Sequence, residues 1–144
     1  GLSFTNEEGK DETPVVIHRA ISGSLERFLG VAIEHFAGAF PVWMAPVQVA
    51  ILPVSAEHHG AYADEIYQAL RKAGIRTVML TEESLGKRIR TAKTQKIPYQ
   101  IVLGEKEQAA QTLTLEGRHD FKQADMTCDE LIKKLSHEIS ERTL

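Results

Sequence analysis

The sequence predicts an α/β protein built on a small mixed sheet of about five strands with helices on both faces. From residue 47 onward, short apolar runs rich in β-branched residues alternate with segments of helical period. The first three runs are separated by segments long enough for crossover helices, so parallel pairing is expected there. The later runs lie close together, which indicates strands added in antiparallel fashion.

The first 45 residues are expected to add one strand and one helix to this set. Residues 1–13 have no periodicity and are expected to form a loop. The run Pro14–Ile21 is typical of a strand, and Ser22–Ser24 ends it. An amphipathic helix that Gly38 ends is expected next. Its apolar residues recur at helical spacing and are Leu25, Phe28, Leu29, Ala32, Ile33 and Phe36.

The segment Phe40–Pro46 carries two prolines and the only tryptophan of the chain, so it is expected to connect two parts of the protein. We expect the boundary between residues 45 and 46. Val47–Pro53 follows as a strand. Ser55 is placed to cap a helix over Glu57–Ala73, and Ile75–Leu80 is the next expected strand.

The remaining residues continue the alternation. Leu85–Thr94 is expected to be a short basic helix, Tyr99–Leu103 a central strand and Glu105–Ala109 a turn. Gln111–Leu115 alternates as a strand does, and the chain leaves room for one more strand after it. The capping box Thr127–Glu130 opens a final helix. Its inward-facing residues are expected to be Leu131, Ile132, Leu135 and Ile139.

Basic residues gather in one stretch of an otherwise acidic chain. The net charge is -3, yet five of the 17 basic residues lie between Gly86 and Lys96 with no acid among them. They are Lys87, Arg88, Arg90, Lys93 and Lys96. A local positive patch beside a buried strand favours an anionic ligand, with nucleic-acid phosphate as the leading candidate. A solvated helix face rich in Lys and Arg explains the charge about equally well.

Composition narrows the class of protein. A chain of 144 residues with 42% hydrophobic and 26% charged residues is typical of one globular domain. No apolar run approaches the ~20 residues of a membrane span, so no membrane is expected as a partner. The polar, acidic first residues resemble neither a signal peptide nor a transit peptide. The single cysteine, Cys128, excludes an internal disulfide and fits a reducing compartment, so a cytoplasmic location is expected.

With these segments in place, a family resemblance can be stated. Residues 13–27, TPVVIHRAISGSLER, contain the pattern HRAxxGSxER and resemble the third signature motif of bacterial-type threonyl-tRNA synthetases. FPVWMAPVQV resembles the junction into the C-terminal anticodon-binding domain of that family, and the resemblance continues through LGKRIR, KIPYQIVLGEKE and the final helix. It implies that residues 1–45 are the end of a class II catalytic domain with its linker. It also implies that residues 46–144 are an anticodon-binding domain with the fold of that class.

The resemblance implies roles for residues in the first part. Arg27 is expected to contact the ATP phosphates, with Ser24 in the same cofactor site, because a fixed guanidinium can neutralise charge developing on phosphate. His18 matches the histidine that binds the active-site zinc. The other two protein ligands of the family lie upstream of this chain, and Cys128 on a distant helix is no substitute. ATP and zinc are therefore expected in the complete enzyme only, a threonine-tRNA ligase, and neither is expected to bind tightly here. The chain should not aminoacylate alone, its partner is the upstream catalytic domain, and the parent protein is expected to be a homodimer.

The resemblance also implies which residues bind threonine tRNA at its anticodon stem-loop. Phosphates are expected to be held by a cationic set, Lys87, Arg88, Arg90 and Lys96. Glu83 or Glu107 is expected to accept hydrogen bonds from bases, and Tyr99 could stack on a splayed base. A core aromatic residue at the start of a strand is an equally good interpretation of Tyr99.

Two residues depart from the family pattern. Glu82 stands where an asparagine is usual, and Glu116 stands where an arginine is usual. A carboxylate near an RNA site should weaken binding unless Arg118, two residues later, takes over. These acids favour an alternative in which the chain is a stand-alone regulatory or scaffold protein with this fold. A prolyl- or glycyl-type synthetase domain is a further alternative that the HRAxxGSxER pattern disfavours.

Overall fold

The computed structural model of the chain describes residues 1–20 and 23–144. The chain divides into two compact units, Gly1–Ala32 and Ile33–Leu144. The expected boundary between residues 45 and 46 therefore lies inside the second unit. Among the described residues, no helix is both long and apolar enough to cross a membrane.

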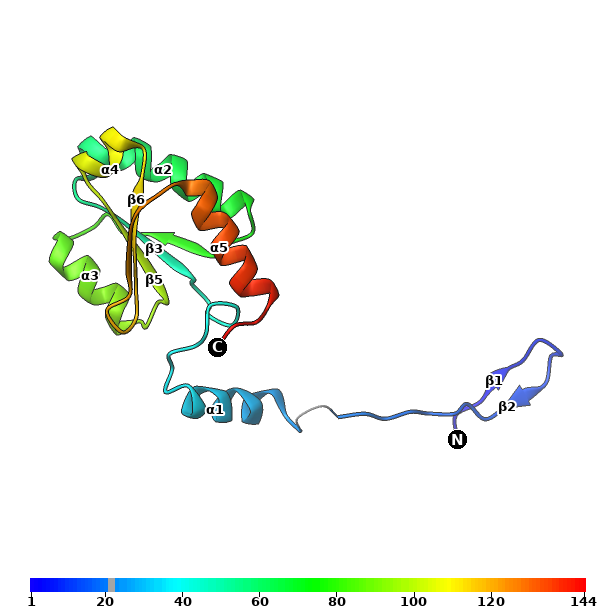
Figure 1. The fold of residues 1–144 in the computed structure, drawn as a ribbon. Coiled ribbons are helices and arrows are strands. Elements are labelled where there is room, and N and C mark those ends of the chain that lie inside the picture. The colour runs from blue at the N-terminus through cyan, green and yellow to red at the C-terminus, as the bar shows by residue number, and fades with distance from the viewer. Residues whose placement is uncertain (21–22) are drawn as a thin grey trace. The chain divides into compact units, whose positions relative to one another are not determined.

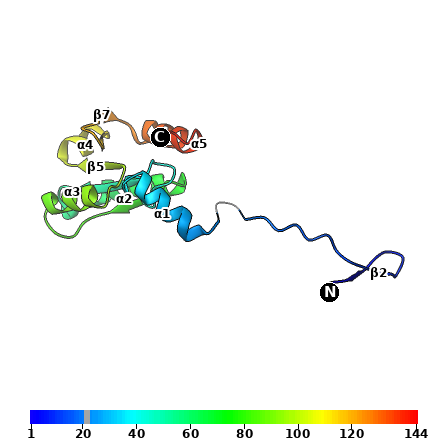
Figure 2. The ribbon, with the colours of Figure 1, turned by 90° about the horizontal axis from the view of Figure 1, so that it is seen from below.

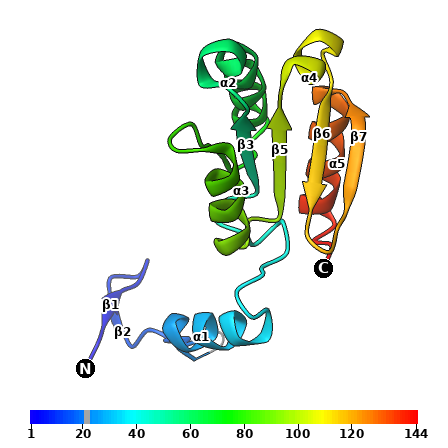
Figure 3. The ribbon, with the colours of Figure 1, turned by 90° about the vertical axis from the view of Figure 1, so that its left-hand side faces the viewer.

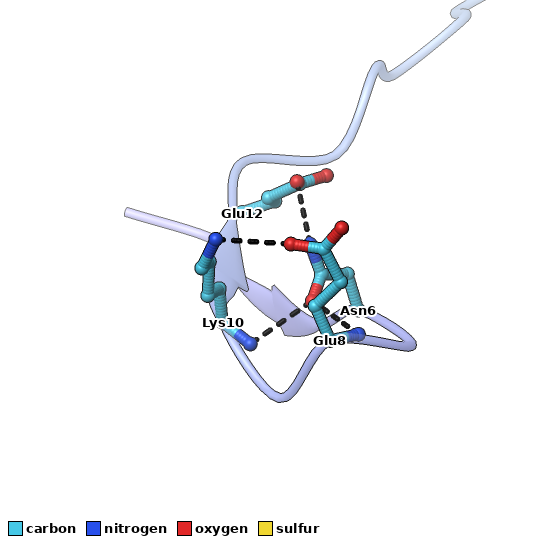
Figure 4. Close-up of polar contacts among 4 residues, drawn as sticks. All are labelled: Asn6, Glu8, Lys10 and Glu12. Atoms are coloured by element: carbon cyan, nitrogen blue, oxygen red, sulfur yellow. Dashed lines mark hydrogen bonds and ion pairs between the residues drawn. The ribbon is translucent and has the colours of Figure 1, made fainter.

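The first unit contains a small hairpin where a loop was expected. Strand β1 (Phe4–Thr5) pairs antiparallel with β2 (Asp11–Glu12). The side chain of Asn6 closes the turn, because its Oδ1 accepts the amide protons of Glu8 at 3.0 Å and of Lys10 at 2.9 Å (Figure 4). An Asn side chain that bonds the backbone two to four residues later imitates a backbone turn, which is why this polar stretch folds back on itself.

The prediction of a strand over Pro14–Ile21 is wrong for residues 14–20, the part of it that the structure describes. Residues 14–20 pair with no strand, and Ile21 and Ser22 lie outside the described residues. Val15 and Ile17 are 90% and 88% exposed. Apolar, β-branched residues favour a strand only where a neighbouring strand can accept their backbone hydrogen bonds. No such neighbour lies beside residues 14–20 in the described part of the chain.

Helix α1 (Leu25–His35) confirms the expected amphipathic helix. It ends one residue before Phe36, the last apolar residue of the expected helix. Ser24 lies before its first turn, and its Oγ accepts the amide proton of Arg27 at 3.1 Å. Gly38, with φ of 75°, ends the segment in the left-handed region that glycine tolerates. The apolar face of α1 is open, since its large side chains are 45–71% exposed.

A five-stranded mixed sheet organises the second unit, in the order β4-β3-β5-β6-β7. Its strands are β3 (Val49–Pro53), β4 (Thr77–Met79), β5 (Tyr99–Leu103), β6 (Leu113–Gly117) and β7 (Lys122–Met126). Strand β3 is parallel to β4 and to β5, and β6 and β7 are added antiparallel. The expected mixed sheet of about five strands is confirmed, and β7 is the additional strand for which the sequence left room.

Helices cover both faces of this sheet, as expected (Figure 1). They are α2 (Ala56–Lys72), α3 (Leu85–Thr94), α4 (Glu105–Ala110) and α5 (Cys128–Ser140). Helices α2 and α5 pack on one face, and α3 packs on the other. Helix α5 is the last element before the C-terminus (Figure 2). Its capping box is confirmed, since the Thr127 hydroxyl accepts the amide proton of Glu130 at 3.3 Å and the Glu130 carboxylate accepts that of Thr127 at 2.8 Å.

The turn expected over Glu105–Ala109 is a short helix, α4. Its N-terminus is held by Glu107, whose Oε2 accepts the amide proton of Gly104 at 3.1 Å. A carboxylate at this third helical position satisfies a backbone donor that the first turn leaves unpaired. Strand β6 consequently begins at Leu113, two residues later than expected.

The core forms two layers around the central strands. Alternation along β3 sends Ile51 to the α2–α5 face and Leu52 to the α3 face, both fully buried. The larger layer contains Ile66 and Leu70 of α2 and, from α5, Leu131. The smaller layer contains few fully buried side chains because α3 covers only part of its face. The sheet therefore has one closed face and one partly open face.

The connecting segment Phe40–Pro46 is held by side chains of the second unit. The Gln48 amide donates to the carbonyl of Val42 at 2.8 Å. Arg76 donates from Nε to the carbonyl of Ala45 at 2.9 Å and from Nη2 to that of Trp43 at 3.0 Å. These bonds explain why the boundary between the units precedes the segment.

Candidate nucleic-acid interface

The candidate interface combines helix α3 with the part of the sheet that α3 leaves open. Figure 3 shows α3 in front of β3, with β5, β6 and β7 uncovered on that side among the described residues. Polar side chains stand on this open strip. They are Gln100 of β5, Thr114 and Glu116 of β6, and Lys122 of β7.

Helix α3 borders the open strip with an exposed cationic face. Lys87, Arg90 and Lys93 are exposed, and their spacing of three residues places them on the outer side of the helix. Lys87 lies 3.5 Å from the carboxylate of Glu83, but both side chains are more than half exposed, so water screens this pair. Lys93 lines the same cavity as Gln100 and Glu116, which turns the end of the cationic face toward the open strip.

Arg88 was expected to contact phosphate, and the structure shows that this prediction is wrong. Its side chain is buried, 6% exposed, and points away from the cationic face. Nη1 donates to the carbonyls of Pro53 at 2.7 Å and Leu80 at 3.0 Å, and Nη2 donates to that of Val54 at 3.4 Å. The guanidinium thus joins the carboxyl ends of β3 and β4 and is not available to RNA.

Glu116 forms the polar centre of the open strip. Its carboxylate accepts from the Gln100 amide at 2.9 Å and lies 3.1 Å from the ammonium of Lys122. Burial raises the pKa of Glu116, but these two donors and the charge of Lys93 outweigh burial and hold its pKa below the ordinary value. The acid that departs from the expected pattern is therefore compensated by cations of the same surface.

The pKa shift predicts how Glu116 contributes to stability. A lowered folded-state pKa adds stability above the unfolded value of about 4.5, and this contribution is lost as the pH falls through the folded pKa. We expect the unfolding free energy of Glu116→Gln at pH 7 to be about 0.5 kcal/mol lower than that of the unchanged chain, for this partly exposed pair, and its urea midpoint to be lower accordingly. At acid pH, below the folded-state pKa of Glu116, the two midpoints should converge. The exposed Asp120→Asn is the matched control, and an equal difference at both pH values would contradict the expectation.

Lys96 is exposed and Arg118 is partly buried, but the charged groups of both already have partners. The ammonium of Lys96 donates to the carbonyl of Ala37, and Nη2 of Arg118 donates to the carbonyl of Lys96 itself. Nη1 of Arg118 donates to the carbonyl of Phe40 at 2.8 Å. A phosphate would have to compete with these backbone carbonyls, so neither residue is a free phosphate ligand.

Tyr99 lies on the closed face of the sheet, where it serves the core. Its ring meets Phe121 edge to face with centroids 6.0 Å apart, and it passes so close to Gly117 that a Cβ there would lie 3.0 Å from it. Its hydroxyl donates to the carboxylate of Glu138 at 3.1 Å. Burial, followed by the charge of Glu138, raises the pKa of Tyr99. The interpretation as a core aromatic therefore fits, and stacking on a base does not.

Glu83 and Glu107 stand near the carboxyl edge of the parallel strands, where α3 and α4 begin. Glu83 is exposed, with φ of 70°. Glu107 is half buried, and its Oε2 is used by Gly104. The second carboxylate oxygen of Glu107 has further acceptor capacity, so this residue can hold α4 and accept from a base.

The residues expected to serve ATP and zinc belong to the other end of the chain. His18 and Arg27 are exposed, and Ser24 is used at the start of α1. Among the described residues, no group of three or more His, Cys, Asp or Glu side chains is placed to hold a metal ion. A lone imidazole does not fit a zinc site, which needs three or four protein ligands.

Three polar residues of the open strip were not identified from the sequence as site residues. They are Gln100, Thr114 and Lys122. A signal existed for Gln100, because alternation along the strand YQIVL places it on the face opposite Tyr99 and Ile101, where it is 7% exposed. Lys122 carried no such signal, since its position depends on the pairing of β7 with β6.

A family model described as an anticodon binding domain matches residues 48–138, which is well over half of the chain. The chain belongs to the family of anticodon-binding domains. This finding confirms the fold that the resemblance implied, and it covers the sheet, α3 and the open strip described above.

Similar curated proteins are several times longer than this chain. The chain is 46% identical to a threonine–tRNA ligase of Chlorobaculum tepidum over 142 residues and 44% identical to one of Prosthecochloris aestuarii over 143 residues. These alignments cover 98% and 99% of this chain, but 22% of each relative. The anticodon-binding domain and the residues before it thus span about a fifth of the length of these curated relatives.

Two solved structures have a fold similar to that of this chain. The RNA binding domain of threonyl-tRNA synthetase from Cryptosporidium parvum superimposes with a TM-score of 0.77 at 32% identity, covering 94% of this chain and 35% of that one. A prolyl-tRNA synthetase of the same organism reaches 0.61 at 23% identity, covering 71% and 23%, which supports the fold alone.

Proposed function

We propose that the chain recognises the anticodon stem-loop of threonine tRNA as the C-terminal part of a threonyl-tRNA synthetase. The observation that carries the proposal is the open strip beside the cationic face of α3. Single-stranded RNA is bound where phosphates meet cations and splayed bases meet polar groups on a sheet. Lys87, Arg90 and Lys93 supply the cations, and Gln100 and Glu116 supply donors and acceptors.

The roles on the two sides of this surface are separable. The cations contact phosphates and position the loop without reading its sequence. Gln100, which is buried, and Glu116 are held together at 2.9 Å and line one cavity, where their amide oxygen and carboxylate would meet the edge of a base. Glu83 and Glu107 at the carboxyl edge of the strands extend the row of acceptors. Sequence preference should therefore depend on these polar groups and affinity on α3.

A titration of the stem-loop tests the proposal. We expect the chain to bind a threonine anticodon stem-loop more tightly than the same stem with a scrambled loop. If about three phosphates are neutralised, log affinity should fall against log salt with a slope of roughly -2 to -3, at about 0.7–0.9 per contact. Fluorescence anisotropy of labelled RNA over a salt series measures both quantities. Equal binding of both loops would contradict recognition of the anticodon.

The rest of the enzymatic activity belongs to the proposed parent protein. The parent would form threonyl-adenylate from ATP and threonine and transfer threonine to tRNA, as a cytoplasmic homodimer. Within this chain Arg27, with Ser24 beside it, would meet the ATP phosphates, and His18 would supply one zinc ligand. The missing ligands are expected upstream, so we propose that this chain alone neither aminoacylates nor retains zinc after dialysis against a mild chelator.

A second candidate is a stand-alone regulatory or scaffold protein with this fold. Glu82 and Glu116 favour it, because both place negative charge beside a surface where RNA would bind. The pairing of Glu116 with Lys122 reduces the force of that argument. A scaffold would bind both stem-loops alike or neither, so the same titration separates the two candidates.

A further inference from the structure

Two cationic side chains at the edge of the candidate interface hold the segment Ala37–Phe40. Lys96, just beyond the end of α3, donates from its ammonium to the carbonyl of Ala37. Arg118, just beyond the end of β6, donates to the carbonyl of Phe40 at 2.8 Å and to that of Lys96. We name Lys96 and Arg118 the clamp, because together they join the ends of α3 and β6 to this segment.

Local backbone geometry lets the clamp close. Lys96 has φ of 54°, a left-handed conformation that turns the chain away from α3. Gly38 lies under its side chain, and a Cβ at Gly38 would be 3.6 Å from Cδ and 3.7 Å from Nζ of Lys96. Nε of Arg118 is buried without a hydrogen-bond partner among the described residues. The guanidinium therefore has unused donor capacity where it touches the segment.

A cavity of about 350 Å³ joins the clamp to the open strip. Its wall includes both clamp residues and Ala39 of the held segment, together with Gln100 and Glu116 of the sheet. Ile97 and Pro98 add apolar surface, and Lys93 and His119 add polar groups. A mixed lining of apolar surface, hydrogen-bonding groups and cations suits a nucleotide, whose base is flat and apolar and whose phosphate is anionic.

We propose that a nucleotide of bound RNA enters this cavity and draws the ammonium of Lys96 from the carbonyl of Ala37 to its phosphate, which loosens the turn Ala37–Ala39. The inference rests on the proposed RNA binding and adds a consequence to it. A charge-assisted bond from ammonium to phosphate is stronger than one to a neutral carbonyl, so the exchange of partners is favourable. Arg118 is a positioning residue in this step, because it holds the carbonyl of Lys96 in place.

The segment Ala37–Phe40 connects α1 to the part of the chain that contains the five-stranded sheet. A looser turn there lets the residues before Ala37 move more freely relative to the sheet. Binding of RNA therefore changes the mobility of the preceding part of the protein. Coupling of this kind is reciprocal. A substitution that removes the Lys96 ammonium loosens the turn before RNA binds. RNA should then cause no further loosening through Lys96.

Amide hydrogen exchange followed by NMR tests the inference on the full chain. The amides of Ala37, Gly38 and Ala39 donate to the carbonyls of Glu34, Ile33 and Phe36 and report on the turn. We expect saturating threonine anticodon stem-loop at low salt to raise their exchange rates at least about threefold, while amides of β3 and β5 keep theirs. In Lys96→Met these three amides should exchange fast without RNA, and RNA should add nothing. Lys133→Met, an exposed site on α5, is the matched control and should respond as the unchanged chain does.

Binding is followed separately by anisotropy, so the two proposals fail differently. Binding of the stem-loop with unchanged or slower exchange at Ala37–Ala39 would overturn the coupling and leave RNA recognition standing. Faster exchange that extends to β3 would also overturn it, because general destabilisation would then explain the change. A stem-loop that does not bind would overturn RNA recognition and the coupling together.

Discussion

Replacement of Arg88 by alanine is expected to lower the free energy of unfolding by about 3–5 kcal/mol, the largest single effect on stability that we predict. The guanidinium donates to three backbone carbonyls at the carboxyl ends of β3 and β4. A buried acceptor left unpaired costs about 1–3 kcal/mol, and the space left by the deleted side chain adds a cavity term. Urea unfolding followed by far-UV circular dichroism measures the difference.

Two further variants at α3 make the result specific. Lys87→Ala removes a basic residue from the exposed face of the same helix and should change stability by no more than about 0.5 kcal/mol. Arg88→Lys keeps the charge but cannot reach all three carbonyls with one ammonium, so it should fall between the other two. A loss below about 1 kcal/mol for Arg88→Ala would show that the carbonyls find other partners and that Arg88 does not join the strands.

Helical period could have placed Arg88 correctly from the sequence. Leu85, Arg88, Ile89 and Ala92 follow the spacing of one helix face, and three of them are apolar. The composition of the stretch hid this pattern, because five basic residues in a short run suggested one common role. Charge alone does not separate a cation that faces solvent from one that binds buried carbonyls.

The partners of Lys96 and Arg118 could not have been predicted in the same way. The carbonyls of Ala37 and Phe40 lie 59 and 78 residues away in the sequence from the side chains that hold them. Local spacing carries no information on such contacts, which depend on the completed sheet. For the same reason, the hydrogen bond from the Tyr99 hydroxyl to Glu138 of α5 could not be predicted from local spacing.

The fold was more accessible because its elements follow local rules. The expected limits of α3 and β5 are those observed, since apolar period, Ser84 and Gly104 mark their ends. The wrong predictions concern segments whose structure depends on an interaction with another part of the chain or with one particular side chain. Residues 14–20 have strand composition but no neighbouring strand, and α4 is a single short helix that depends on the carboxylate of Glu107.

The exposed face of α3 should dominate RNA affinity. We expect a variant with Lys87, Arg90 and Lys93 all changed to Gln to bind the threonine stem-loop at least about 100-fold more weakly at low salt. The slope of log affinity against log salt should rise by about 2–3 units, toward zero, because each lost phosphate contact removes about 0.7–0.9. The stem with a scrambled loop should lose affinity by a similar factor, since these contacts do not read bases. Anisotropy titrations over a salt series provide all three values.

The matched control removes the same charge elsewhere on the surface. Lys10, Lys72 and Lys133 are exposed and lie outside the candidate interface, so changing all three to Gln alters the net charge equally. If binding depended on net charge alone, both triple variants would lose affinity alike. Because counterions are released only where cations meet phosphates, the control should keep its salt slope within about half a unit of the unchanged chain. Equal losses in the two variants would mean that RNA is attracted by the whole surface and that α3 is no binding site.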